Sequence, residues 1–173
     1  MSDDTSTTAN LAKGPRTSLE TWSTGAGMGF VTLVMLAGIF GLAGPGNDTV
    51  RDEGATYKLE VLYTTITRAG QPIPLEIRVT RPGGFDGPIS MSICDEYFDD
   101  LDFQSWYPNP AMEIGGSESL VYEFDPPEGD LLEIDLDARV SPGQFGGHMD
   151  CTLAVLDSGV PAAAVSFDSW RLP

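Results

Sequence analysis

Basic side chains are scarce in this sequence. The 173 residues include 9 Lys and Arg against 26 Asp and Glu, which gives a net charge of −17 and a pI near 4.1. Binding to nucleic acid or to anionic lipid headgroups requires a basic surface. The composition therefore argues against nucleic acid as a partner and against peripheral docking on acidic membranes.

Histidine and cysteine are also scarce. One His (His148) and two Cys (Cys94 and Cys151) leave few ligands for a zinc site or an iron–sulfur cluster. The sequence has no G-x-S-x-G or H-E-x-x-H motif, no P-loop, no dinucleotide fingerprint and no internal repeat. We expect no cofactor and no enzymatic activity. A hydrolase that uses His148 is the enzymatic alternative, and it requires a neighbouring Ser or Cys.

Charge is absent from one long segment. No charged residue occurs between Glu20 and Asp48, and residues 25–44 read GAGMGFVTLVMLAGIFGLAG. Twenty helical residues rise about 30 Å, the thickness of the hydrocarbon core of a bilayer. The segment predicts one transmembrane helix over residues 23–45, as an uncleaved anchor rather than a signal peptide cleaved near Ala43. A buried helix of a soluble protein is the other alternative.

The predicted helix divides the chain into parts. Residues 1–22 are rich in Ser, Thr and Asp and predict a disordered cytoplasmic tail, residues 46–55 a linker, and residues 56–173 an extracytoplasmic domain. Two basic residues flank the helix on each side, so their count does not decide its orientation. A disulfide needs an oxidising compartment, which favours placing the large domain outside the cytoplasm.

Small residues recur along the predicted helix at intervals of four. Gly25 with Gly29, and Ala37 with Gly41, form small-x-x-x-small pairs that allow a second membrane helix to approach closely. They predict a packing face on the helix.

Apolar and polar residues alternate through the C-terminal part. In the clearest run, residues 132–140, five apolar positions alternate with Glu133, Asp135, Asp137 and Arg139. Similar runs occur near residues 57–61, 73–79, 89–93, 120–124, 149–155 and 160–170, with turns rich in Pro and Gly between them. The pattern predicts an all-β, immunoglobulin-like antiparallel β-sandwich of seven to eight strands, with a loop around Tyr107. An unrelated barrel is the alternative.

The two cysteines are 57 residues apart, and Trp106 follows Cys94 by 12 positions. This resembles the Cys…Trp…Cys spacing of immunoglobulin domains and predicts a Cys94–Cys151 disulfide, with two free thiols as the alternative. Cys94 is out of phase with the apolar positions of residues 89–93. Without a bulge it therefore points away from the core.

Carboxylates cluster between Asp95 and Asp102. Because Ca²⁺ prefers several oxygen ligands on one loop, this segment contains weak candidate ligands, although its spacing does not match an EF-hand. The favoured interpretation is a solvated connection over the aromatic residues 97, 98 and 103. The candidate metal ligands are Asp95, Asp99, Asp100 and Asp102.

Several short segments resemble a known family. They are Gly38–Leu42, Ala55–Val61, Arg81–Gly87, Tyr97–Asp99, Phe103, Tyr107–Pro108, Phe124–Gly129 and the end at Pro173. The chain from about residue 30 resembles uncharacterised, mostly actinobacterial, single-pass membrane proteins with one extracytoplasmic immunoglobulin-like domain. Their genes often neighbour those of YetF-like multi-pass membrane proteins, which implies a multi-pass membrane protein as partner. The cysteine pair is not part of that pattern.

Together these features predict a non-enzymatic, membrane-anchored extracytoplasmic interaction module. A Ca²⁺-dependent adhesion or ligand-binding domain is the alternative function. Residues 48–173 hold 23 acidic and seven basic residues, a net charge of −16. Such an acidic, Lys-poor exterior favours solubility in a salt-rich environment.

Overall fold

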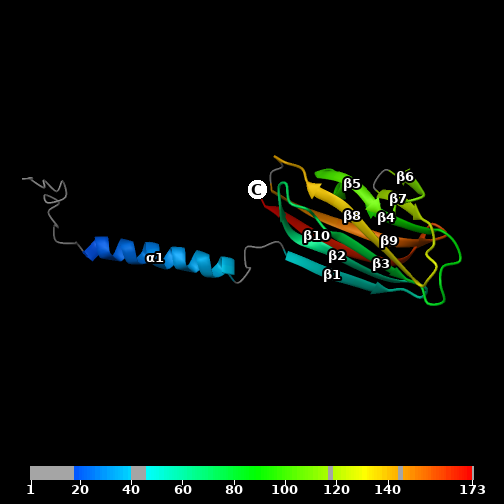
Figure 1. Cartoon of the computed structure of the whole chain (residues 1–173), viewed down its shortest axis with the longest axis horizontal. Coiled ribbons are helices and arrows are strands. Elements are labelled where there is room, and N and C mark those ends of the chain that lie inside the picture. Colours follow the sequence, from blue (N-terminus) through cyan, green and yellow to red (C-terminus); the bar gives the residue numbers. More distant parts are fainter. Residues whose placement is uncertain (1–17, 40–45, 117–118, 144–145, 173) are drawn as a thin grey trace, which may run out of the picture. The chain divides into compact units, whose positions relative to one another are not determined.

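The structure is a computed structural model that describes residues 18–39, 46–116, 119–143 and 146–172, with side chains in the first segment from residue 25 onward. The chain forms two compact units, residues 1–44 and 45–173. The first unit contains helix α1 (Ser18–Ile39). The second contains ten strands and one short 3₁₀ helix, η1 (Asp95–Tyr97) (Figure 1).

Helix α1 lies in the segment where a transmembrane helix over residues 23–45 is predicted. Its described apolar side chains are largely exposed, from Met28 and Phe30 to Leu36 and Ile39. No helix in the described part of the chain has the length and apolar character needed to cross a membrane. Residues 40–45 of the predicted span lie outside the described residues.

Two of the predicted boundaries are wrong. The tail was expected to extend to residue 22, but the helix begins at Ser18, and residues 1–17 lie outside the described part. The predicted linker, residues 46–55, is mostly strand β1 (Gly46–Glu53). This strand pairs along its whole length with β2 (Lys58–Arg68). Its polar sequence lacks the alternation by which the other strands were identified, because none of its side chains is fully buried.

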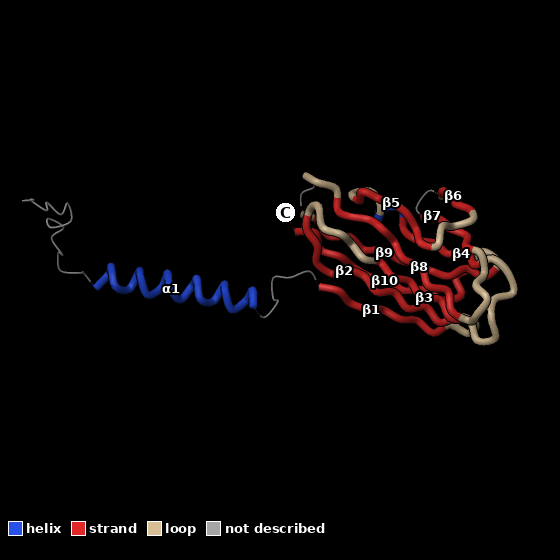
Figure 2. The backbone as a smooth tube through the Cα atoms, viewed as in Figure 1, coloured by secondary structure: helices blue, strands red, loops and turns tan. Residues whose placement is uncertain are grey.

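The strands form one mixed, curled sheet. After β1 and β2 they are β3 (Leu75–Thr80), β4 (Ile89–Cys94), β5 (Leu101–Tyr107), β6 (Met112–Gly115), β7 (Ser119–Phe124), β8 (Leu131–Val140), β9 (Gly147–Asp157) and β10 (Val160–Leu172). The order across the sheet is β5-β8-β3-β2-β10-β9-β4-β7-β6, with β1 also paired to β2. Figure 2 shows the strands wrapped around a common interior.

The sheet curls back on itself, because strands that are far apart in the sheet order are in contact. The ring of Trp106 on β5 lies 5.2 Å from that of Tyr122 on β7, although six strands separate β5 from β7 in the sheet order. Near the middle of the order, Tyr63 on β2 packs on Phe167 of β10 with 4.9 Å between ring centroids. One buried cluster therefore fills the interior from both halves of the sheet.

The all-β class is confirmed, but the sheet differs from the predicted pair of antiparallel sheets. β10 joins β2 in parallel through Trp170–Leu172 and Ile66–Arg68, which makes the two halves continuous. The segment around Tyr107, expected to be a loop, includes the ends of two strands, β5 and β6. Both strands lie at edges of the sheet and are mostly exposed, so they carry no clear alternation.

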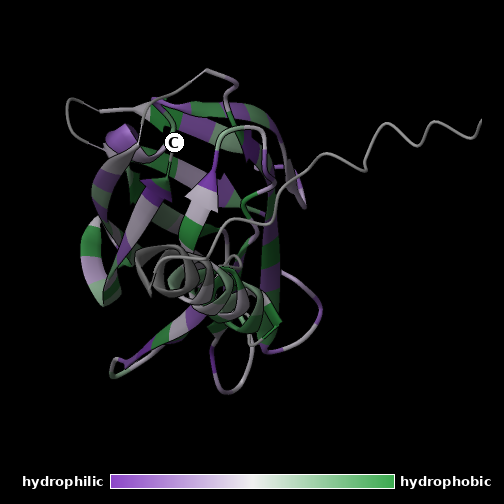
Figure 3. Cartoon of the chain, turned by 90° about the vertical axis from the view of Figure 1, so that its left-hand side faces the viewer, coloured by the Kyte–Doolittle hydropathy of each residue, from purple (hydrophilic) through white to green (hydrophobic). Residues whose placement is uncertain are grey.

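Apolar and polar residues alternate along β3, β4 and β8, and the ribbon in Figure 3 shows strands banded in green and purple. In β8 the buried residues run from Leu132 to Val140, and the intervening Glu133, Asp135 and Asp137 face solvent. This is the arrangement that the sequence pattern predicts. Each of these three strands thus contributes one face to the core and one to the surface.

Tyr97 gives the domain a predicted sensitivity to alkaline pH. Burial raises the pKa of this phenol far above its ordinary value of about 10, and burial also raises the pKa of Tyr63 and Tyr122. Because the unfolded chain releases these protons first, stability should be constant below about pH 9 and fall as the pH rises above about 10. Urea unfolding at pH 8 and pH 10.5 measures this.

A Tyr97→Phe variant is the matched control for that experiment. It lacks the titrating hydroxyl, so its stability should fall less between the two pH values than that of the wild type. Equal losses in both proteins would contradict the role assigned to Tyr97.

Candidate functional site

Cys94 and Cys151 form a disulfide, with 5.5 Å between their Cα atoms. The bond joins neighbouring strands: β4 pairs with β9, and Ile93 lies opposite Leu153. It therefore does not connect two facing sheets as the immunoglobulin comparison predicts. Trp106 packs on Tyr122 and Phe98 within the core. Cys94 is half-buried at the end of β4, as its phase predicts, whereas Cys151 is buried.

The acidic segment after Cys94 is held by arginines. Asp100 forms an ion pair with Arg171 of β10, and Asp102 lies 3.7 Å from Arg139 of β8. Asp95 is in the first turn of η1, and Asp99 is exposed. Within the described residues, no group of three or more His, Cys, Asp or Glu side chains is arranged to hold a metal ion. Beneath the segment Tyr97 is buried and Phe98 packs on the core, whereas Phe103 is partly exposed.

A ladder of polar pairs runs along the outer face of β9 and β10. In register, His148 lies opposite Trp170, Asp150 opposite Asp168, and Thr152 opposite Ser166. The imidazole lies 3.5 Å from each of the two carboxylates and 4.5 Å from the Trp170 ring. The hydroxyls of Thr152 and Ser166 form a hydrogen bond of 2.9 Å.

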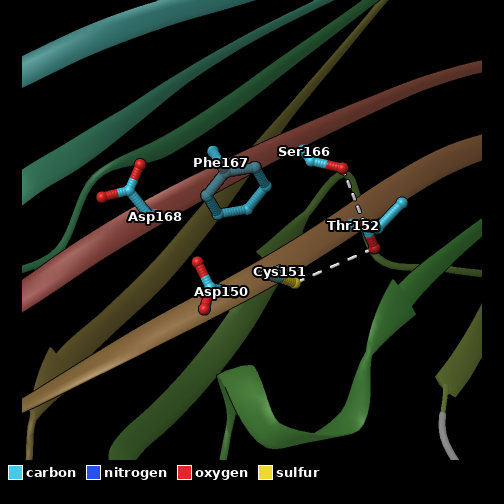
Figure 4. Close-up of a pocket in the computed structure, with 6 residues that line it drawn as sticks. All are labelled: Asp150, Cys151, Thr152, Ser166, Phe167 and Asp168. Carbon is cyan, nitrogen blue, oxygen red and sulfur yellow. Dashed lines mark hydrogen bonds between the residues drawn. The ribbon is translucent and has the colours of Figure 1, made fainter.

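This ladder borders an open hollow of about 260 Å³. Its lining comprises Asp150, Cys151, Thr152, Ser166, Phe167 and Asp168 (Figure 4). The hollow offers two carboxylates and two hydroxyls from adjacent strands. Sequence reasoning singled out His148 for a possible hydrolase and missed the ladder. Two signals were available: His148, Asp150 and Thr152 share one face of a strand, and Ser158-Gly159 is a two-residue turn that sets the register of the β9–β10 hairpin.

Beyond the ladder, the outer face of the same half of the sheet carries few charges, and one of them is Asp52 of β1, whose carboxylate accepts a 2.9 Å hydrogen bond from the backbone N–H of Ala164. A row crosses five strands there and contains Ile114, Val121, Ser92, Ala154 and Ala164, which we call the neutral row. The adjacent row, from Met112 to Leu156, contains one acid, Glu123. Met112 and Ile114 at its margin are 51% and 53% exposed. In a domain of net charge −16, such a surface is unusual.

The other half of the sheet has a different outer face. Arg51, Glu60, Arg78 and Glu133 follow one another across β1, β2, β3 and β8, so that charges of opposite sign alternate. Arg51 donates to Glu60 over 2.8 Å and Arg78 donates to Glu133 over 2.9 Å. The hydrogen bond from Arg51 lowers the pKa of Glu60. This row satisfies its charges internally, whereas the carboxylates of Asp150 and Asp168 face each other.

The remaining predicted site residues are His148, as part of a hydrolase, and the small residues of α1. The contacts recorded for His148 in the described part of the chain are with Asp150, Asp168 and Trp170, so the Ser or Cys neighbour that a hydrolase requires is not among them. On α1, Gly25 and Gly29 border open space, which leaves the helix-packing face a prediction. Its fourth residue, Gly41, lies outside the described residues.

Comparisons with known proteins add little. No protein-family model and no curated protein matches the chain. Among solved structures, a chain of a CaDoc0917–CaCohA2 complex is similar with 12% identity and a TM-score of 0.35, over 62% of this chain and 94% of that one. AvmM, which catalyses macrocyclization in alchivemycin A biosynthesis, is similar with 10% identity and a TM-score of 0.35, over 75% and 89%. Similarities this weak carry no argument about function.

Proposed function

We propose that this protein is a non-enzymatic, membrane-anchored extracytoplasmic interaction module. Its immunoglobulin-like β domain presents the outer face of β6, β7, β4, β9 and β10 to a partner protein. The observation that carries this proposal is the contrast between the two outer faces. One is a row of mutually satisfied charges, and the other combines the neutral row with two facing carboxylates, Asp150 and Asp168, which share the imidazole of His148 as an ion-pair partner.

The acidic pair indicates what the partner supplies. Like charges directly opposite on antiparallel strands are destabilising, and sites that break such local rules are typically functional. The side chain of Asp150 is 81% exposed and that of Asp168 is 56% exposed. A Lys or Arg side chain of the partner relieves the repulsion when it enters the hollow. Trp170, 54% exposed beside the pair, adds a surface on which a guanidinium group stacks.

The neutral row supplies the rest of the interface. Its uncharged side chains lose little hydration when another surface covers them, unlike carboxylates. Exposed apolar residues on edge strand β6, Met112 and Ile114, add area that favours burial. A partner with a flat apolar surface and one protruding basic side chain fits this face.

Membrane anchoring is the other element of the proposal. The described part of α1 exposes eight large apolar side chains, and no charged residue occurs from residue 21 to residue 47. A helix with such a surface requires an apolar environment. We assign residues 23–45 as the anchor. The family resemblance makes a multi-pass membrane protein the expected partner.

Site-specific cross-linking in native membranes tests the proposal. A photoreactive residue replacing Ala164, in the neutral row, should form one specific adduct with a membrane protein. The adduct should decrease at least tenfold in an Asp150→Asn/Asp168→Asn variant, because the variant no longer attracts the partner's basic side chain. Mass spectrometry should place a Lys or Arg within a few residues of the linked position of the partner.

The opposite face provides the matched controls. A photoreactive residue replacing Asp135 on β8 should give no such adduct, and Glu133→Gln/Asp137→Asn should leave the Ala164 adduct unchanged although it also removes two negative charges. Equal losses in the two double variants would indicate a general charge effect and contradict the assigned face.

A further inference from the structure

A second cluster of polar groups lies inside the domain, away from the proposed binding face. Thr67, Tyr97 and Arg171 each bury a polar atom that has no hydrogen-bond partner among the described residues: Oγ1, Oη and Nε. All three residues line one small cavity of about 10 Å³. The other lining residues are Ile73, Leu101, Met149 and Ser169.

Three unpaired polar atoms on residues that line one cavity call for a common explanation. Burying a hydroxyl without a partner is unfavourable, and nearly all buried polar groups in folded proteins are hydrogen-bonded. Thr67 and Tyr97 are each only 2% exposed, so bulk solvent cannot satisfy them. The polar contacts made by the neighbouring groups lead elsewhere: Ser169 donates to the carbonyl of Thr64, and Arg171 pairs with Asp100 through Nη1, so neither contact satisfies the three atoms.

From this geometry we infer that the cavity binds one internal water molecule. A cavity of about 10–15 Å³ holds a single water, which needs two to four polar partners. The guanidinium Nε–H donates to the water oxygen. The hydroxyls of Thr67 and Tyr97 each either donate or accept, so the water can make three hydrogen bonds. The size excludes a larger ligand.

The position of this water gives it a structural role. Thr67 and Arg171 lie opposite each other in the parallel pairing of β2 with β10, which joins the two halves of the sheet. Tyr97 belongs to η1, which follows the disulfide residue Cys94. The water therefore connects the seam of the sheet to the acidic segment, whose Asp100 binds the same arginine.

A crystal structure of the full-length protein at about 1.5 Å provides the direct test. We expect a fully occupied water within about 3.2 Å of both Tyr97 Oη and Thr67 Oγ1. Absence of density in the cavity would overturn the inference. This measurement needs no variant and is independent of the proposed binding face.

Unfolding of full-length variants gives a second readout. If both hydroxyls bind one water, Tyr97→Phe and Thr67→Val should each raise the unfolding equilibrium constant about three- to tenfold. In the double variant the unfolding equilibrium constant should rise several-fold less than the product of the two single effects. The reason is that the first substitution has already weakened the binding of the water that the second would affect. A dry cavity predicts the opposite sign for Tyr97→Phe, since that change would remove an unsatisfied hydroxyl.

The control is a second double variant, in which Tyr122→Phe replaces Tyr97→Phe and is combined with Thr67→Val. Tyr122 is also a core residue but does not line the cavity, so the effects of these two changes on the unfolding equilibrium constant should multiply independently. Independent effects for Tyr97 and Thr67 as well would count against a shared water.

Discussion

Replacing Cys94 and Cys151 together with Ser is expected to lower the free energy of unfolding by about 4 kcal/mol. The disulfide closes a loop with a sequence separation of 57 residues, and a loop of that length restricts the unfolded chain strongly in the chain-entropy model. The loop includes the acidic segment, both exposed edge strands β5 and β6, and strand β8. Urea unfolding of the oxidised protein and the double variant at pH 7 measures the difference.

The reduced wild type is the control for this experiment. Treatment with a phosphine reductant should bring its stability to within about 1 kcal/mol of the double variant, since both lack the same restriction. The double variant itself should not respond to the reductant. A difference below 1 kcal/mol between oxidised and reduced wild type would refute the contribution assigned to this bond.

Trp106→Ala is expected to destabilise the protein by about 3–5 kcal/mol. The side chain is 3% exposed, and its ring lies between 5.2 and 6.4 Å from those of four other aromatic residues, Phe98, Phe103, Tyr122 and Phe124. Truncation removes this packing and leaves a cavity between the two ends of the curled sheet. Because β5 is held on one side only, by β8, we also expect faster amide exchange in β5 than in β3.

The neighbouring residue is a matched control. Tyr107 is also an aromatic residue of β5 but is 77% exposed, so Tyr107→Ala should change the free energy of unfolding by less than about 0.5 kcal/mol. If Tyr107→Ala and Trp106→Ala lowered the free energy of unfolding by similar amounts, the packing of Trp106 would not be what stabilises β5.

Sequence reasoning located the central strands because each has one buried face. Alternation in β8 and β3 correctly predicted which side chains form the core, from Leu132 to Val140 and from Leu75 to Val79. It failed for β1, β5 and β6, which lie at margins of the sheet and bury few side chains. The acidic segment illustrates the same limit: its carboxylates are evident in the sequence, but the arginines that bind Asp100 and Asp102 are 71 and 37 residues away along the chain.

Amino-acid composition and local pattern established the acidic character, the uncharged segment before residue 48 and the all-β class, because each depends only on residue type and short-range periodicity. Tertiary structure decided the rest. The parallel pairing of β10 with β2 brings the end of the chain against its first hairpin. The spacing of the two cysteines predicted that they form a disulfide, but only the fold shows that the bond connects adjacent strands, β4 and β9. Such juxtapositions arise from long-range pairing, which no local pattern in a single chain encodes.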